Sequence, residues 1–379
     1  MASRSVTDDS SASHPPHTPD PTTGPDPATG PDPAGPSTTG KGATASGRAA
    51  LEPMDPQVTT IQPGGGVVMQ LELAWGRVRR WLLRKFRPGY VAAMRSKRRG
   101  GPGGCPFDPV DPRDVKYYAN QATYSWAPAD DPFRWRDRLP FVRVGLAELL
   151  ILGGSCLLAT VLAFSLWWPL GIPFALVTAC VVWFFRDPPR RIPAAAGQVV
   201  SPADGLVVRI AEVEDPVIGP AIEIGIFLSI FNVHANRSPI AGRVLGIEYR
   251  PGKFLNALRP ESEKENERLE VRIEEDQPPY RMMRVRQITG QFARRIVCWV
   301  RPGDPLGRGE MFGMIKLGSR TELVLPREAG LELQVAVGTK VKAGSSLMAT
   351  YRTAPATEEA TNSTEAPGAE GPSAAEDHR

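Results

Sequence analysis

The sequence has few residues of the kind that bind a structural metal or cross-link a small fold. Four cysteines occur in 379 residues, and no two of them form a C-x-x-C pair. This wide spacing argues against a cysteine-based zinc site and against a disulfide framework. The four thiols therefore carry no functional assignment: Cys105, Cys156, Cys180 and Cys298.

Histidine is equally scarce, with four in the whole chain. His14, His17 and His378 lie in terminal segments without apolar periodicity, so His234 is the sole imidazole of the part expected to fold. It follows the apolar run 222–231, in a loop, where binding and catalytic residues concentrate. A lone histidine is also commonly structural, so this pattern alone leaves both interpretations open.

Apolar periodicity is lacking at both ends of the chain. Residues 1–66 are rich in Pro, Thr, Ser, Ala and Gly, and residues 355–379 are similar but acidic. Segments of this composition bury too little apolar surface to fold, so we expect two disordered tails. The first tail also has no apolar run, which argues against a signal peptide.

Residues 67–140 form a basic region that begins with an amphipathic stretch. Aromatic and aliphatic side chains recur there at near-helical spacing, interleaved with arginine and lysine: Leu71, Leu73, Trp75, Val78, Trp81, Leu82 and Phe86 among Arg77, Arg79, Arg80, Arg84, Lys85 and Arg87. The pattern favours an anionic membrane surface, with no nucleic-acid partner expected. A nucleic-acid-binding patch, an ordinary packed helix and a protein-docking element are the alternatives.

Residues 144–185 are almost continuously apolar, and Glu148 is their only formal charge. The run is interrupted at 167–173, and its first leg has the roughly 20 residues needed to cross a bilayer. Arginines flank both ends, which by the positive-inside rule places both ends in the cytosol. We therefore predict a helical membrane hairpin in the cell membrane, with the following domain on the cytoplasmic side. A buried core hairpin of a soluble protein is the alternative.

Residues 186–354 have the pattern of β-strands separated by turns. The expected strands cover 199–208, 222–231, 244–249, 269–273, 283–288, 296–300 and 333–337. No long helix is indicated after Pro189, and residues 338–344 resemble the tight turn of lipoyl-like carrier domains. The predicted fold is thus mostly β, with one β-sandwich-like catalytic domain after the hairpin.

Residues 312–325 read as two short strands joined by a tight turn at Gly318 and Ser319. Glycine permits positive φ and close approach to its carbonyl, and the serine hydroxyl could attack that carbonyl if a base removed its proton. An inert β-turn is the alternative. Asp204, in a Ser-Pro-Ala-Asp-Gly turn, and His234 would complete a constellation whose proximity the sequence does not reveal.

Six motifs, in this order, resemble phosphatidylserine decarboxylase, particularly its short bacterial form. They are Phe-Arg-Asp-Pro at 185–188, Ser-Pro-Ala-Asp-Gly at 201–205, Phe-Leu-Ser-Ile-Phe-Asn-Val-His-Ala-Asn-Arg-Ser-Pro at 227–239, Tyr-Arg-Pro-Gly-Lys-Phe at 249–254, Glu-Asn-Glu-Arg at 265–268 and Gly-Ser at 318–319. The resemblance covers about residues 144–350.

The resemblance implies a proenzyme that cleaves itself between Gly318 and Ser319. Cleavage would leave a large chain, 1–318, and a small chain, 319–379, that begins with a pyruvoyl group made from Ser319. The ketone would form a Schiff base with phosphatidylserine and accept the electron pair left by carbon dioxide, giving phosphatidylethanolamine. Neither a metal nor pyridoxal phosphate is then required, and a homo-oligomer is left open.

Carried over residue by residue, the resemblance assigns Asp204 and His234 to catalysis beside the cleavage pair. Long-form relatives carry a second histidine where this chain has Arg237, and Leu-Gly-Ser-Thr where it has Leu-Gly-Ser-Arg, ending at Arg320. These two arginines, with Asn236, are expected to bind the carboxylate or phosphate of the substrate, because guanidinium groups suit both.

Two other functions stay open. The same chemistry could act on another serine-headed lipid, because the sequence does not reveal tail or headgroup recognition. Alternatively, the chain could be an uncleaved, non-catalytic membrane scaffold, and Arg237 in place of the second histidine is the feature that favours this alternative.

Overall fold

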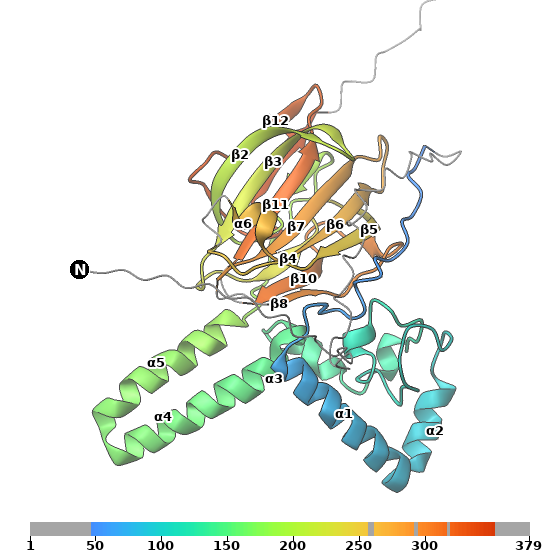
Figure 1. Cartoon of the computed structure of the whole chain (residues 1–379), viewed down its shortest axis with the longest axis vertical. Coiled ribbons are helices and arrows are strands. Elements are labelled where there is room, and N and C mark those ends of the chain that lie inside the picture. The colour runs from blue at the N-terminus through green and yellow to red at the C-terminus, as the bar shows by residue number, and fades with distance from the viewer. Residues whose placement is uncertain (1–46, 257–260, 292–294, 317–318, 353–379) are drawn as a thin grey trace, which may run out of the picture. The chain divides into compact units, whose positions relative to one another are not determined.

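The computed structural model describes residues 47–256, 261–291, 295–316 and 319–352 (Figure 1). All the described residues belong to one compact unit of the chain, Gly42–Arg379. The predicted fold class is confirmed, because the part of the chain after the helical hairpin, 198–351, is built from antiparallel β-strands in three sheets. Residues 1–46 and the C-terminal tail lie outside the described residues. The disorder predicted for residues 47–66 is wrong, because Val58 and Ile61 are buried in hydrophobic clusters of the folded part.

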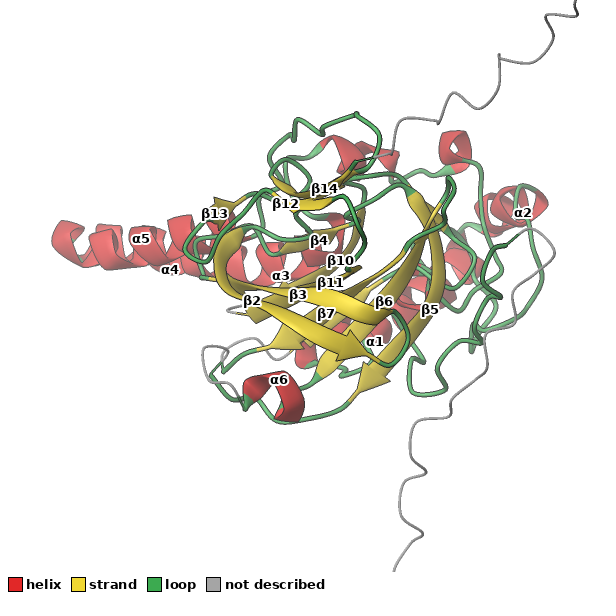
Figure 2. Cartoon of the chain, turned by 90° about the horizontal axis from the view of Figure 1, so that it is seen from above, coloured by secondary structure: helices red, strands yellow, loops and turns green. Residues whose placement is uncertain are grey.

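The largest sheet is curved and has eight strands in the order β13-β2-β3-β11-β7-β6-β5-β9 (Figure 2). Its strands are β2 (Gly205–Asp215), β3 (Gly219–Leu228), β5 (Gly242–Arg250), β6 (Arg268–Glu275), β7 (Met282–Thr289), β9 (Pro305–Leu306), β11 (Ser319–Pro326) and β13 (Lys340–Val341). A short helix, α6 (Ser262–Glu265), precedes β6.

Two three-stranded sheets complete the β-domain. One has the order β1-β14-β12 and contains β1 (Gln198–Val200), β12 (Leu331–Leu333) and β14 (Leu347–Tyr351). The other has the order β4-β10-β8 and contains β4 (Ala235–Arg237), β8 (Arg295–Cys298) and β10 (Met311–Lys316). The strand expected at 333–337 is wrong in its extent, because the ladder of β12 ends at Leu333 and the chain turns at Gly338.

Side chains along each strand of the large sheet point alternately to its two faces, of which one is apolar and the other charged. Ile224, Ile226 and Leu228 of β3 point to one face, where they join the main hydrophobic core. The intervening positions, such as Glu223, point to the opposite face, which carries charged side chains. Side chains on a given strand therefore belong either to the core face or to the charged face.

The predicted amphipathic helix is α1 (Val67–Phe86), and α2 (Pro88–Ser96) follows it directly. Pro88 occupies the first turn of α2, where its missing N–H costs no helical hydrogen bond. Trp75, Trp81 and Phe86 of α1 are largely exposed, so the aromatic side of this helix is not covered by the described part of the chain.

The apolar stretch forms two helical legs that lie side by side (Figure 1). The first leg combines η4 (Arg143–Gly145), α3 (Leu146–Glu148), the π-helical segment η5 (Leu149–Gly153) and α4 (Gly154–Leu166). The second leg is α5 (Trp168–Phe184), which begins inside the expected interruption because its first proline sits in the first turn. Among the described residues, one helix, Arg143–Leu166, is long and apolar enough to cross a membrane.

The bases of the two legs pack against each other at Gly145 and Phe185. A Cβ at Gly145 would lie 2.3 Å from Cδ1 of Phe185, so only glycine fits. The backbone N–H of Val142 also donates to the carbonyl of Phe185 at 3.0 Å. These contacts hold the start of the first leg against the end of the second, beside the β-domain.

Candidate active site

Ser319 is the first residue of β11 and is completely buried. Its backbone lies opposite Leu228 of β3 and Thr289 of β7, so its side chain is on the core face of the large sheet. Among the described residues, none makes a hydrogen bond with its Oγ. Gly318, the other half of the predicted cleavage pair, lies outside the described residues. A buried hydroxyl without a partner is costly, which marks Ser319 as a candidate reactive group.

His234 is the second buried candidate, and it lies just before β4. Its Nδ1 is 3.0 Å from the carbonyl oxygen of Asn232, so Nδ1 carries the proton and the lone pair is on Nε2. Burial, with a smaller contribution from the charge of Arg186, lowers the pKa of His234 to about 4, although the Asn232 hydrogen bond acts in the opposite direction. The imidazole is therefore neutral at pH 7 and suited to accept a proton.

The backbone brings His234 close to the predicted cleavage segment. Its carbonyl accepts a hydrogen bond from the N–H of Ile315 at 3.1 Å, and the next residue, Ala235, is paired with Met314 of β10. Ile315 is only four positions before Ser319. The structure therefore places the one histidine of the described part beside the strand that leads into the Gly318–Ser319 bond.

Asp204 lies in the turn between β1 and β2, at the same end of the large sheet. One carboxylate oxygen accepts the N–H of Ala343 at 2.7 Å, and the guanidinium of Arg190 lies 3.0 Å away. The strand that follows Asp204, β2, is separated from β11 only by β3. Two strand spacings correspond to roughly 10 Å between backbones. Asp204 is thus near the Ser319 end of the sheet, but its described contacts are with Arg190 and Ala343.

A third titratable group lies on the other side of Ser319. The carbonyl of Glu267 accepts hydrogen bonds from the N–H and Oγ1 of Thr289, which is the register partner of Ser319. Burial raises the pKa of Glu267 to about 7, although Arg295 and a hydrogen bond with Tyr249 act in the opposite direction. Sequence reasoning did not single out this carboxyl, since the motif around it gives no sign of burial.

Asn236 forms side-chain hydrogen bonds on the core face next to Ser319. Its Nδ2 donates to Oγ1 of Thr321 at 2.9 Å, and its Oδ1 accepts from Nε2 of Gln287, also at 2.9 Å. All three side chains are completely buried. Because Thr321 shares the face of Ser319 two residues further along β11, this network fixes the position of the strand that carries the serine.

Arg237 has its guanidinium engaged on the protein itself. One nitrogen lies 2.7 Å from Oδ1 of Asp187 and another donates to the carbonyl of Gly309 at 2.8 Å. The arginine that replaces the second histidine therefore ties β4 to the segment after α5. Substrate binding by Arg237 and Asn236 stays a prediction.

Arg320 points away from Ser319, because adjacent residues of a strand face opposite sides. Its guanidinium lies 2.7 Å from a carboxylate oxygen of Glu263 and 3.0 Å from one of Glu322. Gly225 makes room for it, since a Cβ there would lie 2.7 Å from Nη2. The predicted role of Arg320 in substrate binding is untested, but its side chain belongs to the charged face.

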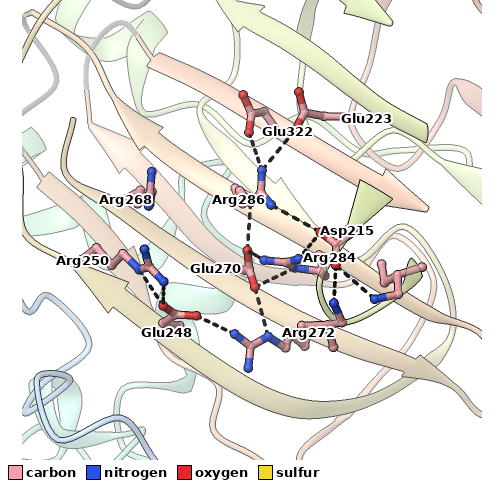
Figure 3. Close-up of polar contacts among 12 residues, drawn as sticks. Asp215, Glu223, Glu248, Arg250, Arg268, Glu270, Arg272, Arg284, Arg286 and Glu322 are labelled. Atoms are coloured by element: carbon pink, nitrogen blue, oxygen red, sulfur yellow. Dashed lines mark hydrogen bonds and ion pairs between the residues drawn. The ribbon is translucent and has the colours of Figure 1, made fainter. Parts of the chain in front are cut away.

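The charged face carries a network of arginines and carboxylates (Figure 3). Figure 3 shows Arg286 between Glu322 and Glu223 on one side and Glu270 on the other. The distances between the guanidinium nitrogens and the carboxylate oxygens of these three ion pairs are 2.8 to 3.2 Å. Glu223, Glu263 and Glu322 have oxygens within 4.8 Å of one another, as a metal site would require. Their arginine neighbours already compensate these charges, so we assign no metal to them.

Sequence reasoning missed the ion pair between Glu148 and Lys316, in which both side chains are buried. One signal was available for Glu148, because a single charge in an apolar run is by default a functional hypothesis. The sequence likewise assigns Arg190 only to the basic flank of the hairpin, whereas the structure pairs it with Asp204. Contacts across such separations have no local sequence signature.

Comparison with known proteins identifies the family. The family model of phosphatidylserine decarboxylase matches residues 177–349. A phosphatidylserine decarboxylase proenzyme of Rhodopirellula baltica is 62% identical over 238 residues, which are 63% of this chain and 99% of that protein. The chain belongs to the phosphatidylserine decarboxylase family. The resemblance drawn from the six motifs is thereby confirmed.

More distant phosphatidylserine decarboxylase proenzymes match in the same way. That of Nitrosomonas eutropha is 43% identical over 204 residues, covering 53% of this chain and 92% of the relative. That of Burkholderia pseudomallei is 41% identical over 219 residues, covering 58% and 95%. The phosphatidylserine decarboxylase model spans Asp204, His234 and Ser319 but begins after Glu148.

Proposed function

We propose that this chain decarboxylates phosphatidylserine to phosphatidylethanolamine after cleaving itself between Gly318 and Ser319. Membership of the phosphatidylserine decarboxylase family supports the activity, and the word proenzyme in the names of its relatives supports the cleavage. The observation that carries the proposal is the buried Ser319 hydroxyl. It follows a glycine and has no hydrogen-bond partner among the described residues.

Self-cleavage would begin when Oγ of Ser319 attacks the carbonyl carbon of Gly318. The Oγ–C bond forms, the peptide C–N bond breaks, and the serine nitrogen takes up a proton, giving an ester. Loss of the Cα proton then breaks the Cβ–Oγ bond. This elimination releases a chain that ends in the Gly318 carboxylate and leaves dehydroalanine at position 319. Water replaces the nitrogen there, ammonia leaves, and the new terminus is a pyruvoyl group.

His234 is the residue that we assign to proton transfer. Its imidazole is neutral, its lone pair is on Nε2, and its backbone is bonded to β10 just before the cleaved bond. Asp204 lies at the same end of the sheet. There it accepts a hydrogen bond from the backbone of Ala343 and forms an ion pair with Arg190. Because Arg237 is occupied by Asp187, a single histidine would serve both the self-cleavage and the decarboxylation.

The surroundings of Ser319 suit the group that would form from it. The side chain is completely buried beside Thr289, which excludes water, and no described residue makes a hydrogen bond with its oxygen that the conversion to a carbonyl would break. Once formed, the pyruvoyl group supplies an electron-accepting carbonyl for the electron pair left by carbon dioxide. The protein contributes the proton-transfer group and the dry environment, and we assign neither metal nor pyridoxal phosphate.

We also propose that the chain is held in the cell membrane, with the β-domain on the cytoplasmic side. The 24 residues of Arg143–Leu166 suffice to span a bilayer, and only 17% of the most apolar stretch of this helix is buried within the protein. A core hairpin of a soluble protein would be mostly covered. The exposed aromatics and arginines of α1 would lie at the lipid surface, close to the substrate.

The decisive experiment is the intact mass of the purified protein beside a Ser319→Ala variant. We expect two chains, 1–318 and 319–379, from the wild type, with the small chain lighter by one ammonia than its sequence requires. The variant should give a single full-length chain. Release of carbon dioxide from phosphatidylserine vesicles is measured on both samples. The wild type should release it, and the Ser319→Ala variant should not.

The two alternative functions predict other results. An uncleaved scaffold would give one full-length chain in both samples and no carbon dioxide. A decarboxylase for another serine-headed lipid would be cleaved but would turn over that lipid in preference to phosphatidylserine in mixed vesicles.

A further inference from the structure

The ion pair between Glu148 and Lys316 connects the first leg of the hairpin to the strand that leads into the predicted cleavage site. Nζ of Lys316 donates to Oε1 of Glu148 and to Oε1 of Gln62, the latter at 3.2 Å. Both charged side chains are about nine-tenths buried. The other oxygen of Glu148 is buried without a hydrogen bond in the described part of the chain.

The charges around this pair come from the membrane-proximal helices. Glu72 of α1 accepts both from Nζ of Lys116 and from the hydroxyl of Tyr117, at 2.7 Å. Lys116 is close enough to interact electrostatically with both Glu148 and Lys316. Two carboxylates and two ammonium groups therefore lie near one another between the helices and β10, with Glu148 and Lys316 buried and Glu72 and Lys116 half-buried.

The position of Lys316 gives this layer a functional consequence. Lys316 is the last residue of β10 and stands three positions before Ser319. Its backbone is paired with Arg295 of β8, so the strand end is held from one side by the sheet and from the other by Glu148. Residues 317–318, which carry the carbonyl to be attacked, start directly from this fixed point.

Stability alone does not account for a buried ion pair here. Replacing such a pair by apolar side chains is often neutral or stabilising, since the desolvation of both charges offsets their attraction. Registry of two elements is the best-attested use of a buried polar pair. Glu148 also lies immediately before the π-helical segment η5, a feature frequent at functional positions of helices.

We propose that the Glu148–Lys316 ion pair positions the end of β10 for self-cleavage, and thereby couples seating of the membrane hairpin to formation of the active enzyme. This inference rests on the proposed function. Attack on a carbonyl requires the reacting atoms to be aligned, and small displacements reduce such rates strongly. Glu148 and Lys316 are therefore positioning residues, which need not contact the substrate.

The test measures the rate of self-cleavage in newly made full-length chains in phospholipid vesicles, by gel and intact mass. Glu148→Gln and Lys316→Met should slow cleavage about 10- to 100-fold, whereas Lys316→Arg should retain most of the rate. The matched control is Asp215→Asn, which also removes a buried carboxylate charge, that paired with Arg284, but at the far end of β2.

A double variant, Glu148→Gln with Lys316→Met, separates positioning from stability. Removing both charges should recover the melting temperature lost in either single variant, while cleavage stays slow. Wild-type cleavage rates in both single variants, or equal slowing by Asp215→Asn, would overturn the inference and leave the proposed function intact. An uncleaved wild type would instead overturn the proposed function, and this inference with it.

Discussion

The ring of Phe184, the last residue of α5, lies 4.6 Å from the ring of His234. The second leg of the hairpin therefore ends directly on the histidine assigned to proton transfer, while the first leg reaches β10 through Glu148. The hairpin is thus part of the environment of the site. Phe184 contributes to the burial that lowers the pKa of His234 and keeps its imidazole neutral.

The first prediction concerns the pH dependence of stability due to His234. Its pKa is about 4 in the folded chain and about 6.5 when unfolded, so between these values the unfolded chain binds the extra proton. Its contribution is present above pH 6.5 and is lost as the pH falls to 4, in total about 3 kcal/mol. Between pH 4 and 7.5, the melting temperature should therefore rise more steeply with pH in the chain that has His234 than in the His234→Gln variant. Both proteins are compared in a Ser319→Ala background. Parallel curves would contradict the buried, neutral histidine.

Much of the site could be predicted from local pattern. The two strands expected around the Gly318–Ser319 pair form as β10 and β11, because their alternating apolar residues fit a buried sheet. The placement of Ser319 in the turn is wrong, because Ser319 is already paired with Leu228 and Thr289 as the first residue of β11. The same period of two already implies that Ser319 and Arg320 face opposite sides of the sheet. A shared role for these neighbours at one ligand would have required a bulge, and the pairing of β11 with β3 is regular.

The long-range contacts could not be predicted in this way. Glu148 and Lys316 are 168 positions apart, and Arg237 and Asp187 are 50 apart. Which opposite charges meet depends on how the hairpin packs on the sheet, and a single sequence carries no record of that. The pattern predicts where charges are unusual, as at Glu148, but does not identify their partners.

A second prediction concerns Glu267, which should show the opposite pH dependence. Its pKa is about 7 in the folded chain and about 4.3 when unfolded, so the folded chain retains a proton that the unfolded chain loses. Its contribution is present below pH 4.3 and is lost as the pH rises to 7, in total about 4 kcal/mol. Glu267→Gln should therefore gain stability relative to the wild type as the pH is raised from 5 to 8. A constant difference between their melting temperatures over that range would refute the raised pKa.

A third prediction separates the structural role of Asp204 from its role in catalysis. Arg190→Met leaves the Asp204 carboxylate buried without its cation and should cost about 3–5 kcal/mol of unfolding free energy. Asp204→Asn can keep the hydrogen bond from Ala343 and should cost less. If Asp204 acts in self-cleavage, Asp204→Asn should stop cleavage at a melting temperature close to that of the wild type. Cleavage that declines only in proportion to stability in both variants would reduce Asp204 to a structural residue.

The fourth prediction concerns Arg320, for which the sequence predicts substrate binding and the structure gives ion pairs with Glu263 and Glu322. Arg320→Ala leaves these carboxylates facing Glu223, and the loss should amount to about 3–5 kcal/mol. Burial already raises the pKa of Glu322, so protonation should relieve the repulsion, and the loss should shrink as the pH is lowered from 8 to 5.

Kinetics on phosphatidylserine vesicles then decide between the two roles of Arg320. A structural arginine on the charged face should leave KM unchanged for whatever fraction of Arg320→Ala is folded and cleaved. Arg237→Ala is the matched comparison, because Arg237 is the other arginine predicted to bind substrate. It follows Asn236, which is bonded to Thr321 on the core face of the sheet. A higher KM for Arg320→Ala without any loss of melting temperature would restore the substrate-binding role, and would require the guanidinium to leave both carboxylates when the lipid binds.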